Sequence, residues 1–182
     1  QPVINANLAD VRTLTINTGA SVTVMPNGTL NIYGDFINSG TFVAPNGFVF
    51  FKGAANQNVD AMTVGTVLVD NAGGITLTGN MTANQSLVLT SGNVTLGINS
   101  LTVNGTVTGT LASHIVTNSS GSVITRNVAV TPVTVPVGHD AGSYNPIIIA
   151  NGSGRDYSVR VGQGLIPAIA NPGLAVDRTW NI

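Results

Sequence analysis

The chain has 182 residues, of which 43% are hydrophobic and only 7% are charged, and its formal net charge is -1. This length and hydrophobic content suffice for one or two domains with a core, and they exclude a disordered chain. The scarcity of charge predicts no nucleic-acid partner, because a phosphate backbone is held by a field of basic side chains. The sequence has no cysteine, which excludes disulfides and thiolate metal sites. Since no apolar run approaches the roughly 18 residues of a membrane helix, we expect no membrane insertion.

The first elements are three copies of a four-residue phrase, TLTI, SVTV and TLNI, within residues 13–32. Apolar residues alternate with Thr, Ser or Asn, which is the period of a β-strand with one buried face. The side chains expected to point into one shared interior are Leu14, Ile16, Val22, Val24, Leu30 and Ile32. Those expected to point outward are Thr13, Thr15, Thr23 and Asn31.

The same alternation continues in short segments, and no helix is predicted. The expected strands are 41–44, 47–51, 66–70, 74–78, 86–90, 100–104, 114–117 and 122–126. Gly, Asn and Ser links between them supply the positive φ angles of sharp corners. Both an antiparallel meander and a β-solenoid fit this spacing, and composition favours the solenoid, because parallel coils stack like residues on like. Three sides predict a coil of about 24 residues, and thus roughly five coils between residues 13 and 128.

The rhythm of short strands breaks near residues 127–140, where prolines enter the sequence. Pro132, Pro136 and Pro146 each remove a backbone donor, which is typical of edge strands and loops. We therefore expect an all-β chain with a β-solenoid over 1–130 and an incomplete β-sandwich-like segment over 131–182. The expected strands of that segment are 144–150, 156–162 and 174–182, and in the last of these one face carries Leu174, Val176, Arg178, Trp180 and Ile182.

Several phrases resemble the β-strand repeats of large secreted and cell-surface proteins of Bacteroidetes. The first is GITLTGNMTANQSLVLTSGNVTLGINSLTVNG, at 74–105, and the others are ITRNV (124–128), VPVG (135–138), YNPIII (144–149) and VDRTWNI (176–182). In those proteins the later phrases follow the repeats and open a β-sandwich-like segment. The resemblance implies an adhesin-like protein of a group often exported by type IX secretion. Together with a start at Gln1, it leads us to expect a secreted, extracellular or cell-surface location.

Three aspartates, Asp10, Asp35 and Asp60, recur at equal intervals in the sequence. If the coil repeat were close to that interval, they would stack on one edge of the solenoid. A ladder of carboxylates about 5 Å apart repels itself unless a cation binds, so these residues are calcium candidates. The alternative is that they are corner aspartates facing water. No other cofactor is expected.

The remaining polar candidates have structural explanations. His114 precedes the inward-pointing Ile115, so we expect it to face solvent. His139 and Asp140 lie beside Ser143 and Tyr144 in one loop, but without the elbow motif of a nucleophile. Arg178 and Trp180 read as a core tryptophan covered by an arginine stem, with a sugar-stacking platform as the alternative. No catalytic residue is assigned, and we expect the protein not to be an enzyme.

The expected function follows from shape, because stacked coils make a stiff, elongated unit. We expect a non-enzymatic extracellular structural protein: a fibre subunit, or an adhesin or stalk segment. The alternative is a carbohydrate-binding module or a degenerate polysaccharide-processing β-helix, and a surface glycan is a possible partner under either interpretation.

Strand edges predict self-assembly into a homo-oligomer or filament. We expect residues 1–11 to donate a strand, with Val3, Ile4 and Leu8 as apolar anchors. The recipient would be the C-terminal sheet of another copy, which is expected to lack strands near Trp180 and Ile182. Repeated head-to-tail contacts of this kind build an open filament.

Replacing Val22 with Asp should lower the free energy of unfolding by several kcal/mol, because an unpaired carboxylate would enter a dry layer. Thr23→Asp changes the neighbouring outward position and should cost under about 1 kcal/mol. Urea denaturation measures both values, and equal losses would contradict the predicted alternation.

Overall fold

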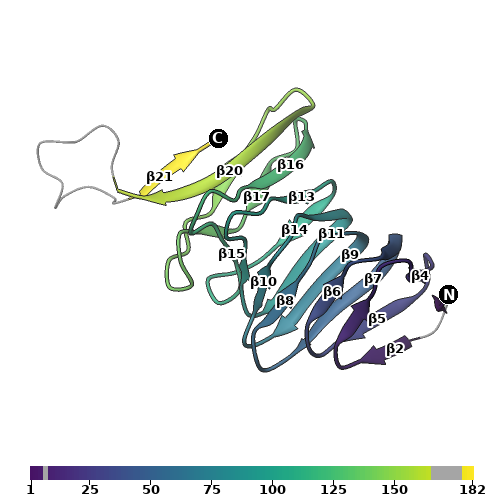
Figure 1. The fold of residues 1–182 in the computed structure, drawn as a ribbon. Coiled ribbons are helices and arrows are strands. Elements are labelled where there is room, and N and C mark those ends of the chain that lie inside the picture. The colour runs from purple at the N-terminus through teal and green to yellow at the C-terminus, as the bar shows by residue number, and fades with distance from the viewer. Residues whose placement is uncertain (6–7, 165–177) are drawn as a thin grey trace, which may run out of the picture.

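A computed structural model describes residues 1–5, 8–164 and 178–182, and all the regular elements in these ranges are β-strands (Figure 1). The large sheet contains β1 (Val3–Ile4), β2 (Leu8–Val11), β4 (Ser21–Val24), β5 (Thr29–Ile32), β7 (Thr41–Gly53), β9 (Met62–Asn71), β11 (Met81–Ser91), β13 (Leu101–Val103), β14 (Thr106–Thr108), β16 (Val123–Val128), β20 (Arg155–Gln163) and β21 (Arg178–Asn181). A seven-stranded sheet contains β3 (Leu14–Ile16), β6 (Phe36–Asn38), β8 (Gln57–Val59), β10 (Ile75–Leu77), β12 (Val94–Thr95), β15 (Ile115–Val116) and β18 (Val137–Gly138). A small pair joins β17 (Val133–Val135) to β19 (Ile147–Ile149). None of the described residues forms a helix that could cross a membrane.

The strands form a β-solenoid of about 7 turns over residues 3–138. Pairing between successive coils is parallel throughout this range, as in the ladder β7–β9–β11–β13, and this confirms the solenoid over the meander. In Figure 1 the coils stack from the purple N-terminal end toward the green and yellow C-terminal strands. Met81 pairs with Leu101, and Ile75 pairs with Val94. The number of residues that separates the two members of each pair is the length of one coil. The predicted coil is therefore too long, and the predicted number of coils is too low.

Each coil has three sides, which we call walls 1, 2 and 3. The large sheet bends between walls 1 and 2 at register shifts after Ala44 in β7 and after Ala83 in β11. Wall 1 contains β4, β13 and the first parts of β7, β9 and β11. Wall 2 contains β5, β14 and the second parts of the same three strands, and wall 3 is the seven-stranded sheet. Strands confined to one of these walls are short because corners follow closely.

The interior is filled by apolar side chains stacked in register. Met62, Met81, Leu101 and Val123 form one such column, and all four are buried. The expected core is confirmed for Ile16, Val22, Val24, Leu30 and Ile32, whereas Leu14 is only half-buried.

We expect Asn31 to be exposed on the outside of the solenoid, and this expectation is wrong. This side chain is 3% exposed, because it lies in register between Asp10 of the preceding coil and Phe50 of the following one. Its amide Nδ2 donates to the Asp10 carboxylate at 2.7 Å, while its Oδ1 is buried without a protein partner. The neighbouring coils thus cover an outward-facing residue.

Two buried amides close the corner between walls 2 and 3. Asn71 Nδ2 donates to the Ala55 carbonyl at 2.8 Å, to Gln57 Oε1 at 2.7 Å and to the Gly74 carbonyl at 3.2 Å. Gln57 Nε2 in turn donates to the carbonyls of Ile32, at 2.9 Å, and Gly34. These bonds give the buried amides of Asn71 and Gln57 their acceptors and join the backbone on both sides of the corner.

The next coil passes this corner closely. Gly92 there has a φ of +78°, and a Cβ at this position would lie 1.9 Å from the Asn71 carbonyl oxygen, so only glycine fits.

The C-terminal end of the solenoid is covered by strands that run against it. β16 pairs in parallel with β13 on one edge and antiparallel with β20 on the other. Val159 and Val161 of β20 are fully buried, and Thr117 Oγ1 exchanges hydrogen bonds with the backbone of Val161. An antiparallel strand cannot continue a parallel coil, so β20 ends the stack.

Parallel pairing continues to β18, which pairs with β15, so the solenoid reaches residue 138, within the range 127–140 where the sequence changes its rhythm. The division into two domains stays a prediction. Pro132 and Pro136 flank β17 and are compatible with the last coil. Residues 165–177 lie outside the described part of the chain, and the separate sandwich-like segment stays a prediction.

The N-terminal end is open in the described residues. β1, β2 and β3 each pair on one side only, with β4, β5 and β6. The inward-pointing residues of this first coil are in contact with the core but only half-buried: Ile4, Ala9, Val11 and Leu14.

Replacing Asn71 with Leu should lower the free energy of unfolding by about 2–4 kcal/mol, because several buried polar groups around the corner lose their partner. Asn104→Leu is the matched control: its amide bonds to Asn84 on the exposed surface, and the loss should stay under about 1 kcal/mol. Chemical denaturation of both variants measures the losses. A neutral Asn71→Leu would show that the corner does not need the network.

Candidate binding notch and interaction surfaces

The three aspartates proposed as calcium ligands do not stack. Asp10 lies beside Asn31 in register, Asp35 Oδ1 accepts the backbone N–H of Asn58 at 2.8 Å, and Asp60 Oδ2 accepts that of Asn38 at 2.9 Å. Their spacing in the sequence exceeds the length of a coil, so each aspartate occupies a different position around the axis. Within the described ranges, no three acidic or histidine side chains come together as a metal site. The carboxylates instead bond neighbouring coils to each other.

His114 is fully buried, and the expectation that it faces solvent is wrong. The loop that follows β18 covers it: its Nε2 lies 3.0 Å from the Asp140 carbonyl oxygen, and the ring of Tyr144 lies 5.6 Å away. A carbonyl can only accept, so Nε2 carries the proton. The backbone N–H of His114 donates to Asn93 Oδ1 at 2.9 Å. His114 therefore joins the last coil to the loop that covers it.

Asp140 and Ser143 are hydrogen-bonded to each other within one turn. Asp140 Oδ1 accepts the Gly142 backbone N–H at 2.9 Å, and the Asp140 backbone N–H donates to Ser143 Oγ at 3.1 Å. The hydrogen bond from Gly142 is the main reason that the pKa of Asp140 is lowered, with smaller contributions from Ser143, His139 and Arg178. These contacts stabilise a local turn.

Trp180 is not a core residue, which corrects the sequence interpretation. It is 37% exposed, and its Nε1 donates to the Asn145 carbonyl at 3.1 Å. Its strand, β21, pairs antiparallel with β20. Of the other residues expected on this face, Leu174 and Val176 lie outside the described residues.

The residues proposed for self-assembly lie at opposite ends of the chain (Figure 1). Val3 and Leu8 are 56% and 62% exposed, Ile4 is half-buried, and Ile182 is exposed near Trp180. However, the proposed donor segment is already the first coil of its own solenoid, since β1 pairs with β4 and β2 with β5. Residues of the proposed donor are therefore already paired within their own fold.

A notch in wall 1 separates two neighbouring coils. Phe36 pairs with Val59, and the next ladder pair between these coils is Ala44 with Val64. Between the two pairs, one coil has residues 37–43 and the other has only residues 60–63. The shorter corner draws β9 away from β7, so the first residues of the two strands do not pair. Outside the notch the wall is regular, because Thr41 opposes Ser21 and Met62 opposes Met81.

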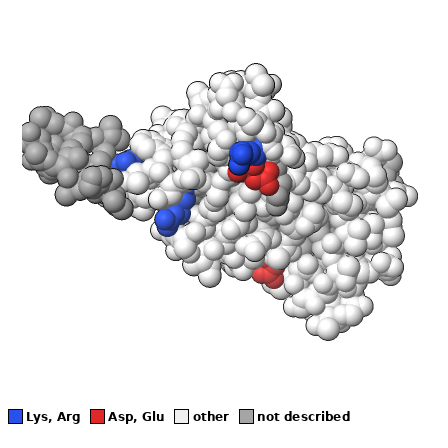
Figure 2. All heavy atoms as spheres, turned by 90° about the horizontal axis from the view of Figure 1, so that it is seen from above, with Lys and Arg blue, Asp and Glu red and all other residues white. Residues whose placement is uncertain are grey.

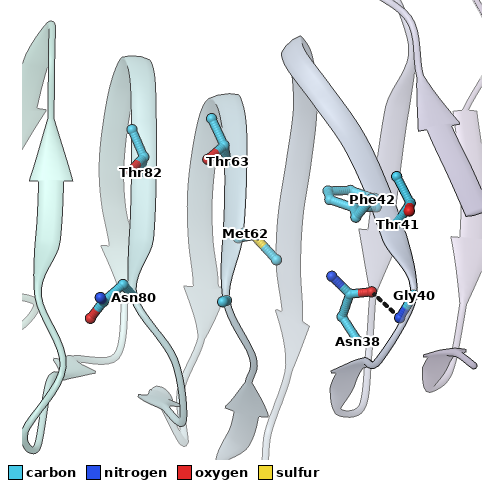
Figure 3. A pocket seen from close by; sticks show the side chains of 9 residues that line it. Asn38, Gly40, Thr41, Phe42, Met62, Thr63, Asn80 and Thr82 are labelled. Carbon is cyan, nitrogen blue, oxygen red and sulfur yellow. Dashed lines mark hydrogen bonds between the residues drawn. The ribbon is translucent and has the colours of Figure 1, made fainter. Parts of the chain in front are cut away.

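Figure 3 shows Phe42 and Met62 pointing into the interval between β7 and β9. The notch has a volume of about 420 Å³. Its lining residues are Asn38, Gly40, Thr41, Phe42, Ala61, Met62, Thr63, Asn80 and Thr82. The ring of Phe42 is half-buried and packs edge-on against the buried Phe36, with ring centroids 5.0 Å apart.

Two asparagine side chains at the notch are held in place by hydrogen bonds that their Oδ1 atoms accept. Asn38 Oδ1 accepts the Gly40 N–H at 3.2 Å, and Asn80 Oδ1 accepts the Ser100 N–H at 2.9 Å. Each oxygen acts as acceptor, so each Nδ2 group is left to donate elsewhere. Neither Nδ2 group has a protein acceptor among the described residues. No charged side chain lines the notch.

Sequence reasoning missed the notch because it depends on register. Its only trace in the sequence is the short spacing between the Val59 strand and the Met62 strand, and this becomes visible only when coils are aligned. Figure 2 shows that the molecule carries few charged side chains on the face in view.

Asp60→Ala should lower the free energy of unfolding by about 1–3 kcal/mol, because Asp60 accepts hydrogen bonds from Asn38 of the preceding coil and Thr78 of the following one. Asp70→Ala, at an exposed position of β9, is the control and should be near neutral.

Thermal melts with calcium and with a chelator should coincide for the parent protein. A rise in Tm with calcium would restore the metal hypothesis.

Comparison with known proteins adds no assignment to these features: no protein-family model matches the chain, and no characterised protein or solved structure matches it. The resemblance to Bacteroidetes surface proteins stays a prediction based on the phrases quoted above. The fold is what is established: an all-β solenoid.

Proposed function

We propose that the protein is a non-enzymatic structural segment of an extracellular fibre, stalk or adhesin. The observation that carries this proposal is the continuous ladder of parallel strands along the solenoid. With about 7 turns, each rising about 4.8 Å, the solenoid extends about 34 Å along its axis. Each coil is bonded to its neighbours on three walls, which makes such a unit stiff along its length.

The contacts of the acidic residues support a structural role. Asp10, Asp35 and Asp60 each accept a hydrogen bond from a different coil, and Asp156 Oδ1 accepts the Asn127 backbone N–H at 3.0 Å. A general acid or base must instead face a substrate. Carboxylates placed as clamps between coils resist separation of the coils, as a segment under tension requires.

We propose that the segment associates through the edge of its first coil. This edge presents three strands, each with one unpaired side, beside the exposed Val3 and Leu8. Unpaired N–H and C=O groups next to apolar side chains favour pairing with another strand. Strand complementation then means that the edge of the first coil pairs with a strand of another copy. Residues 1–11 remain paired within their own solenoid. The exposed Trp180 and Ile182 border the opposite end of the chain.

Self-association tests this proposal directly. The parent protein should show a molar mass that rises with concentration in light scattering. The double variant Val3→Lys, Leu8→Lys should stay monomeric, because lysine on an edge strand opposes pairing. Both side chains are exposed, so the fold should be retained, as circular dichroism would show.

Ile98→Lys is the matched control, since Ile98 is 76% exposed but lies at a corner away from the first coil. This variant should associate like the parent. A parent protein that stays monomeric at high concentration, or a double variant that associates equally well, would contradict association through the first coil.

A further inference from the structure

We propose that the notch between β7 and β9 binds one neutral pyranose unit of a glycan. The notch lies in the side of the solenoid and not at its ends, so this binding site does not depend on the association proposed above. A rod that carries such a site on its side can contact a glycan-coated surface along its length.

The size of the notch fits a single sugar ring. Its volume of about 420 Å³ lies at the lower end of the range of small-molecule sites, roughly 300–1,000 Å³. Ala61 is an exposed residue of the lining, so a longer side chain at this position would take up part of the space. The absence of ladder pairing before Ala44 and Val64 leaves the notch open, because a regular wall would close it.

The apolar part of the notch suits the C–H face of a pyranose. Phe42 presents a half-buried ring whose position is fixed by its edge-on contact with Phe36. Met62, which is 5% exposed, extends the apolar floor beside it. Aromatic rings combine a large apolar surface with a defined orientation, so a flat ligand face is favoured over a branched aliphatic one.

The polar part suits sugar hydroxyls, which both donate and accept. The Nδ2 group of Asn38 is a donor held in place by the bond that its Oδ1 atom accepts from Gly40. Figure 3 shows Asn38 below Phe42 at the interval, whereas Asn80 lies beyond Met62 with its amide directed away from the interval. Thr41, Thr63 and Thr82 add hydroxyls, each of which can donate one hydrogen bond and accept others. Groups fixed before binding reduce the entropy that the ligand must overcome.

The charge of the site selects a neutral sugar. No lysine, arginine or acidic side chain lines the notch, and Asp60, adjacent to Ala61 in sequence, is engaged by Asn38 and Thr78. A uronic acid or a phosphorylated sugar would bring a charge that no side chain of the lining balances. Because the notch is shallow and offers few donors, we expect a dissociation constant in the millimolar range for one sugar unit.

The test uses the whole chain labelled with ¹⁵N and followed by NMR. The probes are the methyl glycosides of glucose, galactose, mannose, xylose and N-acetylglucosamine, with glucuronic acid as the charged comparison. At least one neutral probe should shift the amide signals of Thr41, Phe42 and Thr63 in a saturable way. Signals of wall 3, such as that of Thr76, should stay unchanged, and glucuronic acid should bind more weakly.

Two variants locate the binding. Ala61→Gln fills the notch with a neutral side chain and should abolish the saturable shifts. Phe42→Leu keeps an apolar contact to Phe36 but removes the flat ring, and should weaken binding by about fivefold to tenfold. Ala112→Gln makes the same exchange at an exposed alanine in the turn after β14 and should bind like the parent. Melting curves confirm that each variant is folded.

The proposal is wrong if none of the neutral probes shifts the notch signals, if saturable shifts appear only elsewhere on the protein, or if folded Ala61→Gln binds as the parent does. Stronger binding of glucuronic acid would also overturn it. None of these outcomes bears on association through the first coil, which is read from molar mass and not from sugar binding.

Discussion

Parallel hydrogen bonding between neighbouring coils is the constraint on which the rest of this structure depends. A residue on a wall must lie opposite a residue of the same orientation one coil later, as Thr63, Thr82 and Thr102 do. The interior therefore consists of columns, and most of their positions carry apolar residues. This explains why short apolar–polar alternations recur along the chain, and why one polar residue in an inward column, Gln57, comes with its own buried partner, Asn71.

Because the walls are fixed by register, differences in length between coils must be absorbed at the corners. Corners leave backbone groups without ladder partners, and short polar side chains supply the missing bonds. Asp35 and Asp60 do this for backbone N–H groups, and Asn99 does it for the Leu77 carbonyl at 2.8 Å. Where residues 37–43 face only 60–63, Asp60 bonds the backbone of Asn38, but no ladder pair forms until Ala44 and Val64, and the notch results. The candidate binding site is thus a consequence of unequal corners in an otherwise regular wall.

The alternation of residue types predicts the strands and most of the inward side chains, and composition favours the solenoid over a meander. It could not predict which residues are neighbours across coils, because that requires the length of each coil. The overestimate of coil length put Asp10, Asp35 and Asp60 on one edge, when their true neighbours include Asn31, Asn58 and Asn38. The alternation also predicts that Asn31 and His114 face solvent, because it carries no information on which distant segment covers an outward position. Each is covered by a segment that is distant in the sequence, Phe50 and the loop at Asp140 respectively. The notch was not predicted either, because it depends on how neighbouring coils are aligned.

The two ends of the solenoid differ in a way that bears on assembly. β20 runs antiparallel to β16 and buries Val159 and Val161, so the coil pattern cannot be extended beyond it. The first coil has no such cover in the described residues, and its inward side chains Ile4, Val11 and Leu14 are only half-buried. Among the described residues, therefore, β20 covers one end of the stack and the first coil presents an unpaired edge. Two first coils in contact would form a closed pair with two-fold symmetry, whereas a filament requires the first coil to meet a different surface, such as the outer edge of β21. The distinction lies in symmetry: an isologous contact stops at two copies, and a heterologous one repeats.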